Sequence, residues 1–251
     1  MTPDSPVAIG GGGAVAGYPV GILCLRSTHP LLPGNVQHAQ SFDMPVLYHV
    51  IDLDDPWPLM RGEPQIAAML SEGVEALARQ GVRAVAGACG SFAYYQKRVS
   101  ETAPVPVFLS ILTQLPFLLQ ALPRDARIAV IPAVGESMNA RVYEQCGIGD
   151  PSRLHVAPMR GRPVFDALLD HGVMADVEAL RRETVQCAVA AAHEPGVRAI
   201  LIQCSELPPF AADIQAATGL PVFDMTALVR WLGLITDCRP YSGFTRHVSH
   251  P

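Results

Sequence analysis

Lysine is almost absent from this chain. Lys97 is the only lysine among 251 residues, against 17 arginines. An isomerase that uses pyridoxal phosphate holds its cofactor as a Schiff base on a lysine. Lys97 is predicted to lie on a helix with no phosphate-binding loop beside it. The sequence therefore disfavours pyridoxal-phosphate chemistry, and we expect a reaction that needs no cofactor.

Signals for nucleic acid, membranes and secretion are also missing. The net charge is −5 and no run of basic residues occurs, which argues against a nucleic-acid partner. No apolar stretch reaches the roughly 18 residues of a membrane span. Residues 1–6 carry no positive charge ahead of the apolar stretch, which disfavours a signal peptide. We expect a cytoplasmic protein that binds neither nucleic acid nor membrane.

Metal and hydrolase motifs are lacking too. The eight histidines form no pair four residues apart and no His-Glu-x-x-His, so no metal site is expected. No Gly-x-Ser-x-Gly occurs, which disfavours a serine hydrolase. Six cysteines are too few for a disulfide scaffold, and none are paired as Cys-x-x-Cys. Four are expected to be buried or incidental thiols: Cys24, Cys146, Cys187 and Cys238.

The other two cysteines occupy equivalent positions in an internal repeat. Gly81-Val-Arg-Ala-Val-Ala-Gly-Ala-Cys89 is echoed by Gly196-Val-Arg-Ala-Ile-Leu-Ile-Gln-Cys204, at a constant offset of 115 positions. The match continues without a gap to Phe108 and Phe223, with 8 identities in 28 positions. A duplicated unit of this kind can place two thiols face to face across a pseudo-twofold axis.

Apolar strands alternate with amphipathic helices along most of the chain. Strands are expected over 18–25, 45–51, 82–88, 105–109, 127–131, 154–157, 197–203 and 221–223. Helices are expected over 63–80, 91–102, 112–122, 136–146, 176–193, 211–218 and 226–236, with a turn over 52–58. Together with the repeat, this pattern predicts an α/β fold with two similar lobes, each a mainly parallel sheet flanked by helices.

Each repeat cysteine falls at the C-terminal end of a strand and just before a helix, where α/β sheets bind ligands. Helix-start N–H groups favour the thiolate, so we expect a pKa below the usual 8.5 or so. The same N–H groups can hold a carboxylate or an enolate. They belong to Gly90, Ser91, Ser205 and Glu206. The alternative is that both cysteines are small core residues.

Weaker candidates lie in two loops. Arg26 and Ser27 follow the first strand in a long loop over 26–44, where Arg26 either pairs with a carboxylate or is a surface residue. Ser110 and Thr113 follow the strand that ends at Leu109, and either face the cleft between the lobes or, for Ser110, cap a helix. Glu206 either orients Cys204, binds a substrate amine or caps its helix.

Cys204-Ser-Glu-Leu-Pro-Pro resembles the Cys-Thr-Glu-(Ile/Leu)-Pro motif of the aspartate/glutamate racemase superfamily, which includes hydantoin racemases. Pro33-Gly34-Asn35, Phe42-Asp43-Met44-Pro45-Val46 and the 81–108 block extend the resemblance to roughly residues 18–236. It implies that Cys89 and Cys204 are the acid/base pair, and that Ser205 helps to bind the substrate carboxylate. Glu206 matches the acidic residue of the aspartate-type motif.

The resemblance also implies that the lobes are pseudosymmetric, that the active site lies in the cleft between them, and that the protein forms a homodimer. The final segment is expected to return to the first lobe, giving lobe 1 over 18–110 and 224–251 and lobe 2 over 111–223. Residues 1–17, which include four consecutive glycines ahead of the first strand, are expected to form a flexible tail.

The first cysteine motif departs from the family pattern. Amino-acid racemases of the superfamily have Cys-Asn-Thr, whose side chains hold the α-carboxylate, whereas this chain has Cys89-Gly90-Ser91-Phe92. Ser91 replaces one hydroxyl, nothing is expected to replace the Asn amide, and Phe92 is expected to add an apolar wall. Aspartate and glutamate themselves are therefore disfavoured as substrates, relative to acids with an apolar, aromatic or cyclic substituent.

These features predict a cofactor-independent racemase or epimerase. One thiolate would remove the proton from a carbon next to a carboxyl or amide carbonyl, and the opposite thiol would return one, inverting the carbon. A small acid, amino acid or hydantoin is the expected substrate. The alternatives are a maleate-type cis–trans isomerase or malonate-type decarboxylase on the same scaffold, or a module that binds a small acid without catalysis.

Overall fold

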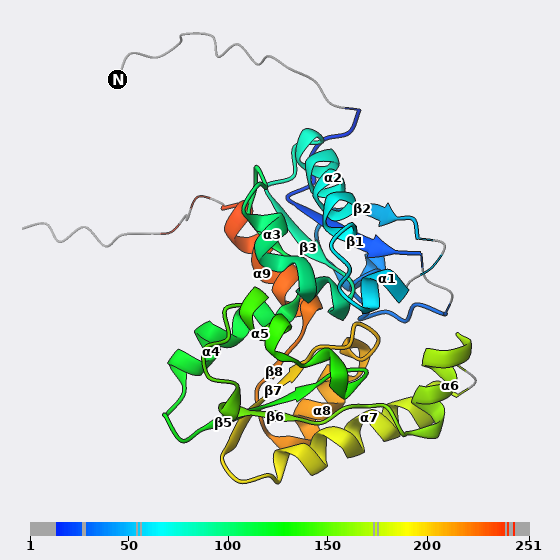
Figure 1. Ribbon diagram of the computed structural model, residues 1–251, viewed down its shortest axis with the longest axis vertical. Coiled ribbons are helices and arrows are strands. Elements are labelled where there is room, and N and C mark those ends of the chain that lie inside the picture. Colours follow the sequence, from blue (N-terminus) through cyan, green and yellow to red (C-terminus); the bar gives the residue numbers. More distant parts are fainter. Residues whose placement is uncertain are drawn as a thin grey trace, which may run out of the picture.

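The computed structural model describes residues 14–26, 29–53, 55, 57–172, 174, 176–238, 240 and 243. Ser27 lies outside this part of the chain, as does the predicted tail up to residue 13. The described chain folds into two α/β halves, one above the other in Figure 1. No helix in these ranges has the length and apolar character needed to cross a membrane.

Each half contains a four-stranded parallel sheet, which confirms the predicted fold class. The strand orders are β2-β1-β3-β4 and β6-β5-β7-β8, the same arrangement twice. The first sheet comprises β1 (Val20–Leu25), β2 (Val46–Ile51), β3 (Ala84–Gly87) and β4 (Val107–Phe108). The second comprises β5 (Arg127–Ile131), β6 (Leu154–Val156), β7 (Val197–Ile202) and β8 (Val222–Phe223).

The sequence repeat extends to the pairing of the strands. Val85 of β3 pairs with Val107 of β4, and Ile200 of β7 pairs with Val222 of β8. The second pair is the first displaced by 115 positions, the offset of the repeat. The two cysteines therefore follow equivalent strands of equivalent sheets.

Helices cover both faces of the sheets. The first half has α1 (Trp57–Met60), α2 (Ile66–Arg79), α3 (Gln96–Ser100) and the 3-10 segments η1 (Ala39–Ser41) and η2 (Gly90–Tyr95). Next come η3 (Ile111–Gln114), α4 (Leu115–Ala121), η4 (Gly135–Ser137), α5 (Ala140–Gln145), η5 (Pro151–Arg153), α6 (Pro163–His171), α7 (Val177–Ala192), η6 (Pro208–Phe210) and α8 (Ala211–Thr218). The last is α9 (Met225–Thr236).

Helices α1 and α6 were not expected, and the helix expected over 91–102 is partly a 3-10 helix. α1 lies where a turn was predicted, and α6 starts with Pro163 in its first turn and ends at Gly172, whose φ of +64° suits glycine. The helix expected over 91–102 is a 3-10 segment followed by a single short α-helix. Short helices of this kind carry too few residues for a clear periodic pattern.

Helix α9 connects the two halves. Asp224 caps its start by accepting a hydrogen bond from the Ala227 N–H at 2.8 Å. The helix follows β8 of the second sheet, yet it packs against β1 and β3 of the first sheet (Figure 1). The chain therefore returns to the first half at its C-terminal end.

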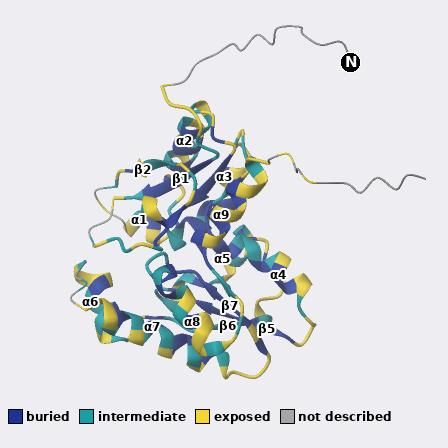
Figure 2. Cartoon of the chain, turned by 180° about the vertical axis from the view of Figure 1, so that it is seen from behind, coloured by how far each residue is buried: buried dark blue, intermediate teal, exposed yellow. Residues whose placement is uncertain are grey.

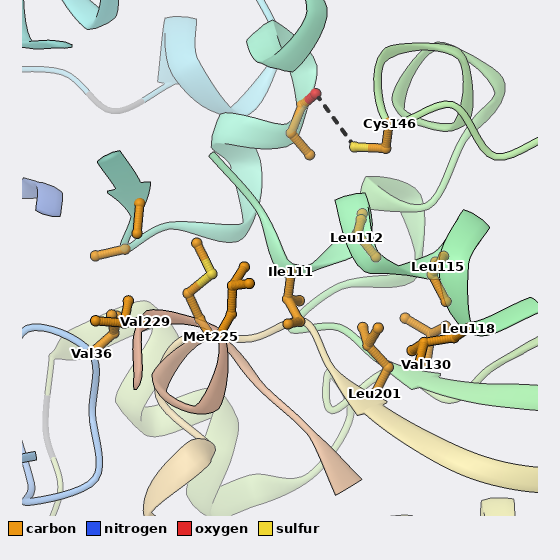
Figure 3. Packing of buried hydrophobic residues seen from close by; sticks show 14 of the residues in the cluster. Val36, Ile111, Leu112, Leu115, Leu118, Val130, Cys146, Leu201, Met225 and Val229 are labelled. Atoms are coloured by element: carbon orange, nitrogen blue, oxygen red, sulfur yellow. Dashed lines mark hydrogen bonds between the residues drawn. The ribbon is translucent and has the colours of Figure 1, made fainter. Parts of the chain in front are cut away.

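The core runs without interruption from one half to the other. Figure 2 shows buried strands behind helices whose outer faces are exposed. One cluster joins Val20 and Ile22 of β1 to Val130 of β5 and Leu201 of β7. Figure 3 shows Ile111 and Met225 between Val36 and Val229 on one side and Leu201 and Val130 on the other. This shared cluster fixes how the two sheets face each other.

Replacing Leu112 by alanine tests the shared cluster. Leu112 is fully buried in η3, so Leu112→Ala should lower the free energy of unfolding by about 2 to 5 kcal/mol. Phe117 of α4 is the control, since its side chain is 72% exposed and Phe117→Ala should change the value by no more than about 0.5 kcal/mol. Urea unfolding measures both, and equal losses would contradict the packing described.

Candidate functional site

Cys89 and Cys204 line one cavity between the two halves. Its wall consists of Gly87, Ala88, Cys89, Gly90, Ser110, Ile111, Ile202, Gln203, Cys204, Ser205 and Met225. About 10 Å³ is open to the centre of a water molecule, which is room for about one water. The predicted cysteine pair therefore meets in space, in a closed site too small for a substrate with several heavy atoms.

Both cysteines follow the inner strands of their sheets. Cys89 comes two residues after β3, in extended conformation, and η2 begins at the next residue. Cys204 comes two residues after β7, and its N–H and that of Gln203 both donate to the carbonyl of Ile131, at 3.3 and 3.0 Å. The strands and these hydrogen bonds hold the two thiols at the carboxyl edges of the sheets.

Burial raises the pKa of both thiols, and the predicted lowering is wrong. Desolvation has the largest effect on the pKa of Cys89 and raises it. Hydrogen bonding by Ser91 and by the Phe92 N–H lowers this pKa, as expected, but by less. Burial also raises the pKa of Cys204, and the Glu206 carboxylate raises the pKa of both thiols further. In the closed cavity both cysteines are therefore thiols at neutral pH.

Glu206 is held by residues of the long loop of the first half. Its carboxylate accepts a hydrogen bond from Asn35 Nδ2 at 3.0 Å and lies 3.2 Å from His29 Nε2. The Ser205 hydroxyl also donates to it, at 3.4 Å. The hydrogen bond to Glu206 raises the pKa of His29. The half-buried Glu206 carboxylate thus lies between the loop and the second half, and it acts on both thiols electrostatically.

Gly34 brings the same loop close to the second half. Its φ is +102°, and a side-chain carbon at this position would lie 2.7 Å from the Cα of Pro209. Its carbonyl accepts a hydrogen bond from the Thr226 hydroxyl of α9 at 2.7 Å. Both the backbone conformation and the close approach require glycine here. The loop therefore lies across the junction of the two halves.

A second group of polar contacts joins the halves through α5. Asn139 Nδ2 donates to the Tyr94 hydroxyl at 2.7 Å, and the Lys97 N–H donates to Gln145 Oε1 at 3.1 Å. Arg141 donates to the carbonyl of Gly62, and its guanidinium lies 5.4 Å from the ring centroid of Tyr94. Contacts on the loop side and on the α5 side thus hold the two halves together around the cavity.

The structure brings part of the predicted set together. Gly90, Ser110 and Ser205 line the cavity. The Ser91 hydroxyl donates to Met60 Sδ at 3.0 Å, and Ser91 lowers the pKa of Cys89 against the larger effect of burial. Ser110 also caps η3, accepting from the Leu112 N–H at 3.3 Å. The Thr113 hydroxyl donates to the carbonyl of Ser110 and is not part of the cavity wall.

Arg26 lies apart from the cavity that the two cysteines line. Its guanidinium pairs with Asp52 at 2.8 Å, and both side chains are mostly exposed. It borders a separate open groove of about 560 Å³ with Tyr48 and Val50. Arg26 is therefore a surface residue, one of its two expected placements, and it is not part of the wall that Cys89 and Cys204 line. Ser27 lies outside the described residues.

Two expectations about the first motif are corrected. Phe92 is fully buried in the core beneath α2 and does not line the cavity. An amide does replace the missing asparagine, because the Gln203 side chain lies against Gly90 from the opposite half. Gln203 was missed because it looks like the last residue of an apolar strand. The repeat could have revealed it, because the polar Gln203 aligns with the small apolar Ala88 in the first half.

The remaining cysteines lie away from this site, and all six are free thiols. Burial raises the pKa of Cys24 to about 11 and that of Cys146 to about 12. Cys187 is buried in the second half, and Cys238 is exposed. Within the described part of the chain, no three His, Cys, Asp or Glu side chains are grouped as metal ligands would be.

A family model described as Asp/Glu/Hydantoin racemase matches residues 46–232, most of the chain. The chain belongs to this family. The match covers both sheets apart from β1, both cysteines and most of α9. The resemblance drawn from the Cys204-Ser-Glu-Leu-Pro-Pro motif is thereby confirmed.

Curated relatives in the Asp/Glu/Hydantoin racemase family carry the name of a lyase. Dimethylsulfoniopropionate lyase 6 of Emiliania huxleyi (strain CCMP1516) is 33% identical over 222 residues, 84% of this chain and 58% of that protein. Dimethylsulfoniopropionate lyase of Durusdinium sp. clade D is 34% identical over 205 residues, 78% of this chain and 67% of that protein. The chain thus spans little more than half the length of the first of these relatives.

A solved structure supports the fold. Allantoin racemase from Pseudomonas fluorescens superposes with a TM-score of 0.56 at 18% sequence identity, covering 90% of this chain and all of that one. At this identity the likeness concerns the arrangement of the two sheets. It agrees with the pseudosymmetric fold of the family.

The raised thiol pKa values predict an order of alkylation. At pH 7.5, iodoacetamide should modify the exposed Cys238 well before Cys89 and Cys204, because both cavity thiols are protonated and enclosed. Peptide mass spectrometry over time measures each rate, and the unfolded protein, in which all six thiols react, is the control. Faster labelling of Cys89 or Cys204 than of Cys238 would contradict the closed, desolvated site.

Proposed function

We propose that this protein removes a proton from the carbon next to the carboxylate of a small acid, using a cysteine thiolate as the base. The observation that carries the proposal is the placement of Cys89 and Cys204 on one cavity between pseudosymmetric halves. A carboxyl group acidifies the carbon beside it, and a buried site with N–H donors stabilises the enolate that forms. No cofactor is needed for this step.

Elimination is the outcome that we propose for the carbanion. The relatives named dimethylsulfoniopropionate lyases share 33% and 34% identity over most of this chain, whereas the allantoin racemase shares 18%. In a propionate with a dimethylsulfonio group on its β-carbon, loss of the α-proton can expel that group. The substrate class is therefore a small carboxylate that carries a cationic leaving group at the β-carbon.

The charges around the cavity suit such a substrate. Glu206 raises the pKa of both thiols, and burial raises it further. A sulfonium cation that enters the site adds a positive charge beside Glu206, which offsets this effect and favours the thiolate. Binding of the cationic substrate would thus favour formation of the cysteine thiolate that removes its proton. An ammonium group would act in the same way.

The elimination step balances without a further reactant. The thiolate sulfur takes the α-proton, and the electron pair of that C–H bond forms the double bond between the α- and β-carbons. The bond from the β-carbon to sulfur breaks, and its electron pair leaves with neutral dimethyl sulfide. Acrylate remains, and the thiol returns its proton to water when the site opens.

Racemisation is the second candidate, and the second cysteine favours it. An elimination needs one base, whereas inversion needs a base on one face of the carbon and a proton donor on the other. Cys89 and Cys204 reach the cavity from opposite halves, as that reaction requires. A small acid without a leaving group would then be inverted at the same carbon.

One set of incubations separates the two outcomes. Elimination predicts acrylate and dimethyl sulfide from dimethylsulfoniopropionate, with the catalytic rate falling by about 10² to 10⁴ in Cys89→Ser or Cys204→Ser, whichever removes the base. Racemisation predicts deuterium at the inverted α-carbon of hydantoins, or of small acids with an apolar or aromatic substituent, in heavy water. Cys187→Ser is the control, since this thiol is remote and buried. Turnover that survives both cavity substitutions would exclude a thiol base.

The pH profile tests the electrostatic role of Glu206. Since only the thiolate is the base, kcat/KM should rise with pH by up to tenfold per unit through neutral pH. Glu206→Gln removes the negative charge that raises the pKa of both thiols, so the rising limb should move to lower pH. A profile that is flat in the wild type, or that moves to higher pH in Glu206→Gln, would contradict this role.

A further inference from the structure

The side-chain amide of Gln203 borders the cavity and has no hydrogen-bond partner among the described residues. Gln203 is only 6% exposed and lines the cavity between Cys89 and Cys204. Its amide makes no hydrogen bond to any described residue. Gln96 is equally buried, but its amide donates to the Val107 carbonyl at 2.9 Å and accepts from the Leu109 N–H at 2.7 Å. Because the Gln203 amide borders the cavity and its hydrogen-bonding groups are not used by the protein, it suits a ligand.

Small residues of the first half make room for this amide. A side-chain carbon at position 90 would lie 2.7 Å from the amide carbon of Gln203 and would overlap its nitrogen. Only glycine leaves that space free. In the repeat, Gln203 aligns with Ala88 and Ser205 aligns with Gly90, so the second half supplies the larger, polar residue at both positions. The amide therefore reaches across the junction to lie beside Cys89.

The other hydroxyls of the wall already take part in hydrogen bonds within the protein, Ser205 as a donor and Ser110 as an acceptor. The Ser205 hydroxyl donates to Glu206 at 3.4 Å, and the Ser110 oxygen accepts from the Leu112 N–H at 3.3 Å as a cap of η3. The nitrogen of the Gln203 amide carries two hydrogens for which the described residues offer no acceptor. A carboxylate has only acceptors, so it complements this end of the amide.

We propose that the Gln203 amide binds the substrate carboxylate and thereby sets the direction of the substrate in a nearly symmetric site. The inference rests on the proposed function for the identity of the ligand as a small carboxylate. The carboxylate lies toward Gln203 and Gly90, and a cationic group points toward Glu206. When the α-proton leaves, negative charge moves onto the carboxylate oxygens, so this hydrogen bond strengthens as the reaction proceeds.

Binding of propionate tests the inference apart from catalysis, since propionate has no leaving group and no stereocentre. Gln203→Met removes the amide and keeps the length of the side chain. It should weaken propionate binding, measured by calorimetry, about tenfold or more, because a hydrogen bond to a charged group is lost. Its Tm should stay close to that of the wild type, since no hydrogen bond within the protein is lost.

Gln96→Met is the matched control, because both ends of that amide are bonded within the protein. It should lower the Tm and leave the propionate Kd within about twofold of the wild type. Gly90→Ala should displace the Gln203 amide and weaken propionate binding by a similar factor. The double variant Gly90→Ala/Gln203→Met should bind no more weakly than the weaker single variant, because both remove one interaction.

Three results would overturn the inference: no saturable propionate binding by the wild type, an unchanged Kd in Gln203→Met, or a Tm of Gln203→Met as low as that of Gln96→Met. None of them depends on turnover. The proposed function fails separately, if the cavity thiols prove dispensable for elimination and for deuterium exchange.

Discussion

The burial of two thiols in one small cavity is the constraint on which the rest of this structure depends. A thiolate is costly in a site with room for about one water, and the N–H groups of Ser91 and Phe92 do not outweigh that cost at Cys89. Glu206 makes the thiolate still less favourable. Under the proposed function, the base therefore forms together with substrate entry, through opening of the halves or through a positive charge on the substrate. This condition links the charge of the substrate to the chemistry.

Two nearly equal halves build the site, and a few residues make it unequal. Equivalent strands pair in the same register in both halves. The backbone of the two sheets alone would therefore not distinguish one end of a small acid from the other. Gln203 stands where the first half has Ala88, and only the second half has the anion Glu206. Asn35 of the long loop binds this anion from across the junction. We therefore attribute the proposed orientation of the substrate to Gln203 and Glu206, which have no counterpart in the first half. The positions of the two thiols follow from the repeat that both halves share.

The sequence predicted the parts that follow from local pattern and from the repeat. Strand ends, the α/β class and the meeting of Cys89 with Cys204 follow from apolar runs and a constant spacing. The sequence could not predict that the pKa of both thiols is raised, because this shift depends on how deeply the folded protein buries them. Gln203 belongs to no motif, and Asn35 entered only through the family resemblance, because their contacts join residues that are distant in the chain. Arg26 had the right chemistry for a carboxylate, but in the folded protein it pairs with Asp52 at the surface.

A crystal structure of the protein with propionate would test the central claim most directly. The account predicts propionate between the halves, with its α-carbon about 3.5 Å from the sulfurs of Cys89 and Cys204 on opposite faces, as a near-attack arrangement requires. Its carboxylate should contact Gln203. Propionate bound instead in the groove beside Arg26, or thiols kept apart by protein atoms with no ligand between them, would contradict the account.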